Sequence, residues 1–145
     1  MKLIVKDFDD LSNIEVYEIL KSRCEVFMLE QRIICQDMDD VDYKSKHCFF
    51  LEKNRVIAYL RAFYIDNDTV SIGRVLTLNH RQGIGTMLMN KSIDYIKDNM
   101  QCKKIQLHSQ SQATGFYAKL GFEIISDEFL EEGVPHVMME LEINN

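Results

Sequence analysis

The feature that most constrains the fold is a glycine-containing turn between a predicted strand and a predicted helix. Gly83 and Gly85 follow the extended segment 69–78 and open a helical pattern over residues 84–99, after which residues 103–108 form another predicted strand. A strand, a helix and a strand in this order make a right-handed βαβ crossover with parallel strands. The chain must therefore contain a parallel strand pair with a helix on one face.

The remaining segments build an α+β fold around this crossover. Three extended segments separated by short turn signals predict an antiparallel meander ahead of it. The predicted elements are strand 2–6, helix 11–30, polar loop 31–46, strands 47–52, 55–64 and 69–78, helix 84–99, strand 103–108, helix 111–120, and strands 122–125 and 136–143, the last two separated by acidic turns at 126–134. We expect a mixed sheet, antiparallel first and parallel at one junction, with helices on its faces.

The first predicted helix has one predicted apolar face and contains no glycine or proline. Tyr17, Leu20, Cys24 and Phe27 recur at helical spacing, so they predict one apolar face. The single proline and the few glycines of the chain lie outside this segment, and nothing in it interrupts a helix.

Composition limits the class of protein. The 145 residues are enough for one domain, which we take to span 1–145, and 46% hydrophobic residues can form a core without disulfides or metals. A net charge of −6 argues against a nucleic-acid-binding surface. Four scattered cysteines without a CxxC pair, no signal-type apolar segment and no long apolar run predict a cytoplasmic protein with free thiols and no membrane segment.

The glycine turn is also a predicted anion site. Amide groups in the first turn of a helix have no intrahelical partners and carry the positive end of the helix dipole, and Gly83 and Gly85 let an anion approach them. Arg81 adds a full positive charge, and residues 74–104 as a whole have a net charge of +4. The turn matches neither a Walker motif nor a dinucleotide fingerprint. The alternative is a tight turn that binds nothing.

The polar loop contains a second charged pattern. Asp37, Asp39, Asp40 and Asp42 do not fit a calcium loop, because Val41 interrupts the order of ligands and glycine is missing. We expect no metal site, and we interpret these carboxylates as a solvated loop or as an attraction for a cationic amine. His108, in the strand after the crossover, is interpreted as structural, with a smaller chance that it faces a cofactor cleft.

Several motifs together resemble one family. The sequences Ile72-Gly73-Arg74-Val75, Gly83-Ile84-Gly85 and Phe116-Tyr117-Ala118-Lys119-Leu120-Gly121-Phe122 occur in the order and spacing of the GNAT superfamily of acyl-CoA-dependent N-acetyltransferases. Arg23-Cys24-Glu25-Val26-Phe27, Glu30-Gln31, Gln36-Asp37, Asp39 and Gly133-Val134-Pro135-His136 are similar to its ElaA-like subgroup. The resemblance implies a GNAT-like fold with acetyl-CoA as co-substrate.

The resemblance also implies positions for the cofactor. Backbone amides of the strand before the turn, Val75, Leu76 and Thr77, are expected to hold the pantetheine and polarise the thioester. The pyrophosphate is expected at the turn, on Arg81, Gln82, Gly83, Ile84, Gly85 and Thr86. Here His80 stands at the motif's usual Gln or Arg position, and the preceding loop is about two residues shorter than usual. Gln110 stands where many members carry Asn, and it is the expected contact to the pantetheine arm.

The catalytic assignments rest on the same resemblance. Tyr117 is the expected general acid, with a core tyrosine as the alternative. His136 and Glu30 are candidates for the base or for acceptor contacts, although His136 also fits a half-exposed structural histidine. Arg23 and Gln31 are expected to shape the acceptor pocket; Arg23 and Glu30, seven residues apart, share a face of a regular helix, and a pair of surface charges is the alternative.

These observations predict an N-acetyltransferase that moves an acetyl group from acetyl-CoA to a primary amine by direct transfer in a ternary complex. The acceptor is a small molecule or an amine of a peptide or protein, and a homodimer is compatible with the sequence. The alternatives are a catalytically idle acyl-CoA-binding sensor or regulatory domain and, with less support, an interaction domain in which the glycine turn binds nothing.

Overall fold

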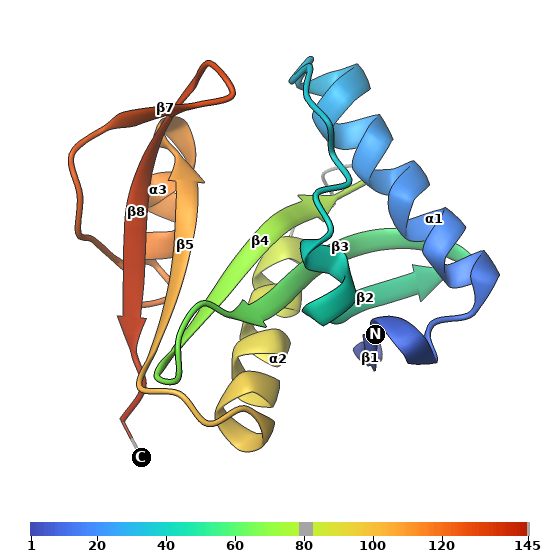
Figure 1. Cartoon of the computed structure of the whole chain (residues 1–145), viewed down its shortest axis with the longest axis horizontal. Helices are drawn as coiled ribbons and strands as arrows, with labels where there is room; N and C mark the ends of the chain where they lie inside the picture. The colour runs from blue at the N-terminus through green and yellow to red at the C-terminus, as the bar shows by residue number, and fades with distance from the viewer. Residues whose placement is uncertain (79–82, 145) are drawn as a thin grey trace.

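One mixed sheet organises the molecule, for which a computed structural model describes residues 1–78 and 83–144 (Figure 1). Its strand order is β1-β2-β3-β4-β5-β8-β6, and β7 pairs with β8. The strands are β1 (Ile4–Asp7), β2 (Lys46–Glu52), β3 (Arg55–Tyr64), β4 (Thr69–Thr77), β5 (Lys104–Gln110), β6 (Glu123–Ile124), β7 (Phe129–Glu131) and β8 (Val134–Glu142), and the helices are α1 (Asn13–Arg23), α2 (Ile84–Asn99) and α3 (Thr114–Ala118).

The predicted topology is confirmed. Strands β2, β3 and β4 form the antiparallel meander. Strands β4 and β5, which precede and follow α2 in the sequence, form the parallel pair. The fold is therefore α+β, as expected. Of the described helices, none combines the length and the apolar character that a membrane span requires.

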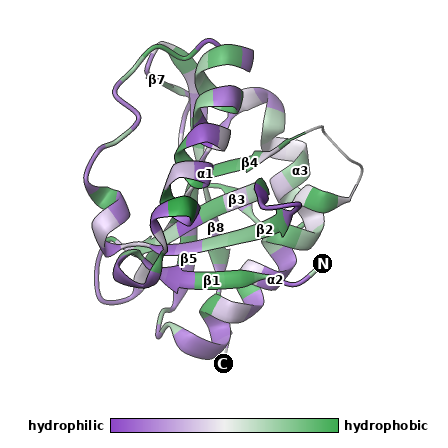
Figure 2. Cartoon of the chain, turned by 90° about the vertical axis from the view of Figure 1, so that its right-hand side faces the viewer, coloured by the Kyte–Doolittle hydropathy of each residue, from purple (hydrophilic) through white to green (hydrophobic). Residues whose placement is uncertain are grey.

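Helices cover the two faces of the sheet unequally. Side chains alternate between the faces along a strand. Phe49, Tyr59 and Leu76 pack in one cluster with Ile19 of α1, whereas the larger cluster on the other face contains α2 and Tyr117 of α3. In Figure 2 the strands between the helices are mainly hydrophobic, and the outer segments are more hydrophilic.

The first helix differs from its prediction. Ser12 and Glu15 form a reciprocal capping box at its start, but from Cys24 to Glu30 the chain continues as a π-helix. Tyr17 is 67% exposed, whereas Ile19, Arg23 and Val26 are buried, so the predicted apolar face is wrong. Hydrogen bonds from residue i to i+5 widen the turn, and Arg23 enters the interior because carboxylates meet it there.

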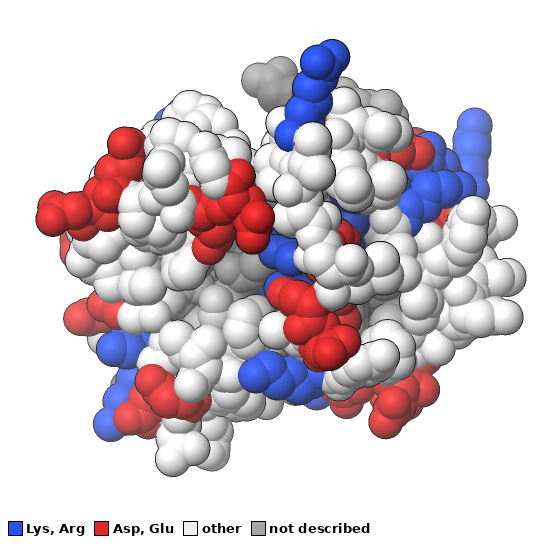
Figure 3. Space-filling view, turned by 45° about the horizontal axis from the view of Figure 1, so that its top comes forward, with Lys and Arg blue, Asp and Glu red and all other residues white. Residues whose placement is uncertain are grey.

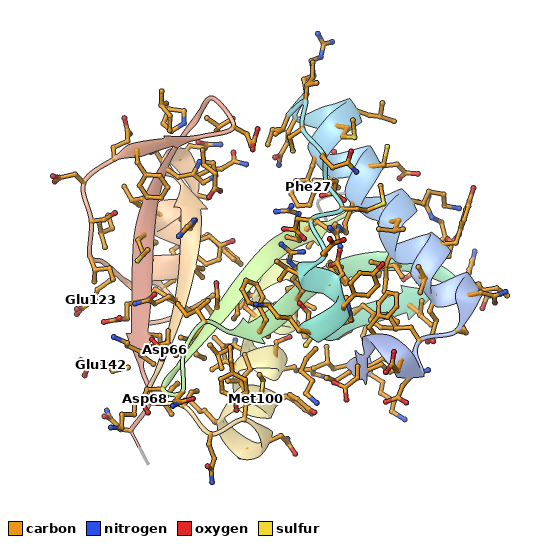
Figure 4. All side chains as sticks on the ribbon, viewed as in Figure 1. Phe27, Asp66, Asp68, Met100, Glu123 and Glu142 are labelled. Atoms are coloured by element: carbon orange, nitrogen blue, oxygen red, sulfur yellow. The ribbon has the colours of Figure 1, made fainter. Side chains whose placement is uncertain are left out.

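Two segments predicted as loops contain further structure. The acidic stretch 126–134 forms β7, which turns back through Glu132 and Gly133, both at positive φ, to pair with β8. The polar loop contains a 3₁₀ turn at Val41–Lys44. The β3–β4 turn carries Asp66 and Asp68 at the end of the sheet remote from β7 (Figure 4).

Candidate active site

Strands β4 and β5 part halfway along their length. Their paired residues run from Thr69 with Lys104 to Ile72 with Leu107, and beyond these pairs the strands diverge, as Figure 1 shows. The divergence coincides with an irregularity in β4, where the register with β3 shifts and Arg74 has a φ of +53°. Residues 75–77, for which cofactor contacts were predicted, lie on the freed edge of β4.

The start of α2 lies at the end of this open edge. Gly83 precedes the helix with a φ of +86°, a conformation that glycine adopts without strain. A Cβ on Gly83 would meet no described atom within 4 Å, whereas one on Gly85 would lie 3.4 Å from the Phe116 ring and 3.7 Å from the Thr77 side chain. Gly85 thus lets the helix start approach β4 and α3 closely, and Gly83 keeps the amides of the first turn accessible.

These features fit an acyl-CoA molecule. The freed edge of β4 offers backbone groups to an extended arm, and the amides of Ile84, Gly85 and Thr86, which have no acceptor within the helix, suit a pyrophosphate. The predicted contacts Arg81 and Gln82, and His80 beside them, lie outside the described residues.

Tyr117 lies on the α2 face of the sheet, near the opening between the diverging parts of β4 (residues 73–77) and β5 (residues 108–110). Its side chain is buried, and its ring makes edge-to-face contacts with Phe116 and Phe122. No hydrogen bond to its hydroxyl is found among residues 1–78 and 83–144. Burial raises the pKa of Tyr117 to about 12, so the phenol keeps its proton at neutral pH.

Three arginines and three aspartates form a closed ring on the α1 side of β4. Asp37 bridges Arg23 and Arg74, Asp42 bridges Arg23 and Arg61, and Asp39 bridges Arg61 and Arg74. We call these six residues the Arg–Asp ring. The contact between Arg61 and Asp39 is bidentate, at 2.7 and 2.8 Å.

The ring changes two interpretations made from the sequence. The carboxylates of Asp37, Asp39 and Asp42 are not free to attract an amine, because arginines bind them. Arg23 is 1% exposed, and its guanidinium donates hydrogen bonds to Asp37 and Asp42. Arg23 therefore holds the polar loop against the end of α1. Arg74 is likewise engaged by carboxylates, which removes one charge from the basic segment expected to face phosphates.

A second charged cluster lies across the opening. Glu131 of β7 accepts a hydrogen bond from Nδ1 of His108 at 2.8 Å, and its other oxygen lies 3.6 Å from Nε2 of His136. Phe129 stacks on His136 and meets His108 edge to face. In Figure 3 acidic side chains flank a hollow in which basic side chains are visible. The exposed His108 is thus part of a cluster, and His136, at 7% exposure, is more buried than expected.

One contact joins the two sides of the opening. The side-chain amide of Gln110, at the end of β5, donates a 2.9 Å hydrogen bond to the side-chain oxygen of Gln31. Sequence reasoning assigned these residues to the cofactor and acceptor sites, and the structure brings them together. Phe27 lies on the side of the π-helix that faces β4 (Figure 4).

Glu30 differs from Arg23 in burial. Glu30 is exposed at the end of the π-helix, whereas Arg23 is interior. The predicted shared face required a regular helix, and the π-helix between the two residues removes that spacing.

Sequence reasoning missed Glu131 altogether. It lies in a stretch of acidic residues and turn formers, where nothing local distinguishes it from Glu128 or Glu132. The available signal was the pattern Glu-x-Gly ahead of Pro135-His136, which indicates a hairpin that carries Glu131 back over the next strand.

Comparison with known proteins identifies a family with the same fold. A family model described as an acetyltransferase (GNAT) domain matches residues 9–143. The UPF0039 protein C11D3.02c of Schizosaccharomyces pombe is 33% identical over 99% of this chain and 98% of its own length. ElaA of Escherichia coli is 31% identical over 92% of each chain, and its crystal structure superposes with a TM-score of 0.90, covering 98% of this chain and 100% of that one.

A more distant solved structure shares the fold alone. It is an aminoglycoside 6'-N-acetyltransferase complexed with coenzyme A, with a TM-score of 0.74 and 13% identity over 98% of each chain.

A sheet that parts between two parallel strands, beside an open helix start, defines the GNAT class of acyl-CoA-dependent transferases. The chain belongs to this acetyltransferase family, and within it to the ElaA-like subgroup.

Proposed function

We propose that this protein is an acetyl-CoA-dependent N-acetyltransferase, working as a single domain over residues 1–145, that acetylates a primary amine by direct transfer in a ternary complex. The observation that carries the proposal is the opening between β4 and β5, with the start of α2 at one end and a protonated, buried Tyr117 beneath it. When bound, acetyl-CoA supplies an acyl group activated as a thioester.

Each side of the opening has a proposed task. The backbone of Val75, Leu76 and Thr77 orients the acyl carbonyl, and the first turn of α2 neutralises phosphate charge. Arg81 and Gln82 add pyrophosphate contacts, and Gln110 contacts the pantetheine arm once its hydrogen bond to Gln31 opens. Glu30 and Gln31 contact the acceptor, whereas His136, at 7% exposure, supports this surface from behind Glu131.

Tyr117 is the proposed acid. Overall, an alkylammonium ion and acetyl-CoA become an N-alkylacetamide, free CoA thiol and one proton. The departing sulfur needs a proton, and a phenol with a pKa of about 12 still holds one at any pH where the enzyme works.

A Tyr117→Phe variant tests this assignment. We expect kcat to fall by about 10²-fold, because a positioned acid contributes roughly that much, while the KM for acetyl-CoA changes little. The measurement is CoA release against a panel of primary amines. Tyr117 has no hydrogen bond to lose among the described residues, so the variant should keep its stability. Unchanged turnover in a folded variant would refute the acid role.

The alternative function is an idle acyl-CoA-binding sensor, and the two differ in turnover rather than in binding. Millimolar acetyl-CoA should raise the melting temperature in either case, since a ligand that binds only the native state stabilises it. Binding without acetylation of any amine in the panel would favour the sensor, and no stabilisation would contradict both. The four free cysteines support a reducing, cytoplasmic location.

A further inference from the structure

His108 lies at the point where the sheet opens. Leu107 pairs with Ile72 in the last β4–β5 pair, so His108 is the first residue of β5 beyond the pairing. Its neighbour across the gap, Gly73, carries no side chain. The imidazole therefore stands at the inner end of the opening along which the acyl arm is proposed to lie.

The face on which His108 lies is the one open to an acceptor. Alternate residues of β5 point to the same side, so His108 shares a face with Gln110, and Gln110 reaches Gln31 at the end of the π-helix. Ile105 and Leu107 point to the opposite face, where they pack in the same cluster as Tyr117. His108 and Tyr117 thus approach the opening from opposite sides of the sheet.

The hydrogen bond to Glu131 fixes how His108 carries its proton. A carboxylate oxygen only accepts, so Nδ1 of His108 donates across the 2.8 Å contact. In the neutral ring this leaves the lone pair on Nε2. The His108 side chain is 41% exposed, so that lone pair can meet a substrate.

His136 has the opposite arrangement. Its Nδ1 donates to the carbonyl of Val134 at 2.7 Å, so the lone pair of a neutral ring points from Nε2 toward Glu131, 3.6 Å away. The ring is 8% exposed and stacked on Phe129. Its contacts place it behind Glu131, and it has little open surface for an amine.

We propose that His108, oriented by Glu131, is the base that deprotonates the acceptor ammonium in the proposed N-acetyltransferase reaction. The inference rests on the proposed function. One N–H bond of the alkylammonium breaks, its proton bonds to Nε2 of His108, and the electron pair stays on the amine nitrogen as the attacking lone pair. The imidazolium then releases this proton to solvent. Glu131 is a positioning residue, which holds the ring and stabilises its charged form.

The charges around the pair support this role. The hydrogen bond that His108 donates to Glu131 raises the pKa of His108, and the same bond lowers the pKa of Glu131. Among the described residues, His136 of β8 and Arg74 of β4 also lower the pKa of Glu131. A more basic imidazole captures a proton from an ammonium more readily, provided that it is neutral beforehand.

The first test needs no acceptor. The chain has four histidines, and NMR titration of their ring protons, with His108→Gln to assign the signal, measures each pKa. We expect the pKa of His108 to lie above the ordinary histidine value of 6.5 in the wild type and to be lower in Glu131→Gln. Glu132→Gln, which removes the adjacent exposed carboxylate, is the matched control and should leave it unchanged. If Glu131→Gln leaves it unchanged as well, the pair does not exist as described.

The second test uses the best acceptor from a panel of butylamine, ethanolamine, spermidine and a lysine-containing peptide. His108→Gln should lower kcat by at least about 10²-fold with little change in the KM for acetyl-CoA, because a positioned base contributes roughly 10² to 10⁴. The acidic limb of the kcat/KM profile should lie at the pKa of His108 and move to lower pH in Glu131→Gln.

The outcomes distinguish a failure of the base assignment from a failure of the proposed N-acetyltransferase function. Turnover that survives His108→Gln, or an acidic limb that stays in place when the pKa of His108 moves, overturns the base assignment and leaves the N-acetyltransferase standing. Acetyl-CoA binding by the wild type without acetylation of any amine in the panel overturns both.

Discussion

The two charged clusters beside the opening are built from similar groups and differ in what they leave free. In the Arg–Asp ring every arginine bridges two carboxylates and every carboxylate bridges two arginines, and the side chains of Arg23 and Arg61 are at most 4% exposed. Across the opening, the side chains of Glu131 and His108 are 44% and 41% exposed, and within residues 1–78 and 83–144 Nε2 of His108 has no hydrogen-bond partner.

This difference separates a structural cluster from a chemical one. In the ring each carboxylate is already paired with two arginines, the cations of Arg23 and Arg61 are buried, and the net charge is zero. It joins the end of α1, the polar loop and the irregular part of β4, so it fixes the shape of the opening. The half-exposed cluster can exchange protons because its groups reach solvent. In the proposed mechanism it is therefore exposure, more than the number of charges, that suits the His108–Glu131 pair to proton transfer.

Removing one cation from the ring gives the largest expected effect. Arg23→Met keeps most of the side-chain volume and leaves Asp37 and Asp42 each short of a partner in a buried setting. Breaking a buried ion pair from one side costs about 3–5 kcal/mol, so we expect a loss of that size in the free energy of unfolding, measured by urea titration.

The matched control for this variant is an exposed pair. Lys21 binds Glu18 at 2.8 Å but is 40% exposed. Lys21→Met should therefore cost less than about 1 kcal/mol. Equal losses in the two variants would contradict the view that the ring is a buried structural unit.

Acid should weaken the Arg–Asp ring. Hydrogen bonds from Arg61 lower the pKa of Asp39 from 3.8 to about 2. A carboxyl with a lowered pKa contributes stability that is complete above its unfolded pKa and is lost as the pH falls through the folded one. The loss due to Asp39 therefore lies between about pH 4 and about pH 2. Because its side chain is 34% exposed, we expect about 1 kcal/mol from it after allowance for solvent screening.

Chemical denaturation at a series of acidic pH values measures this loss. Asp39→Asn should be less stable than the wild type at neutral pH and should lose less stability between about pH 4 and about pH 2. A variant whose acid dependence matched the wild type would show that Asp39 is not held by Arg61 in solution.

The fold could be predicted because its signals are local and periodic. The glycine turn between a strand and a helix specified the crossover, and alternation specified the meander. The first helix was harder, because its inward face includes polar side chains: apolar spacing favoured Tyr17, and the structure buries Arg23. Helical periodicity also assumes that buried positions are apolar, which the ring contradicts.

The site could be predicted only where residues act through the backbone. Among the described residues, Val75, Leu76, Thr77, Gly83 and Gly85 lie beside the opening, and their selection follows from the turn and the family resemblance. Both charged clusters join residues that are distant in the sequence: Arg23 meets Asp37 across a loop, and His108 meets Glu131 through a hairpin of β7 with β8. Pairing of this kind depends on strand register, which one sequence does not specify.

The smallest expected effect concerns the stability contributed by the half-exposed pair. The raised pKa of His108 adds stability that is present below its unfolded pKa and is lost as the pH rises through its folded pKa. The lowered pKa of Glu131 adds stability that is present above its unfolded pKa and is lost as the pH falls through its folded pKa. The pair therefore stabilises the fold most between the unfolded pKa of Glu131 and that of His108, at about pH 6. Both groups are more than a third exposed, so Glu131→Gln should cost less than about 1 kcal/mol there and almost nothing near pH 9, by urea titration at both values. A loss as large as that of Arg23→Met, or one that persists at alkaline pH, would place Glu131 among the structural groups and remove the distinction between the two clusters.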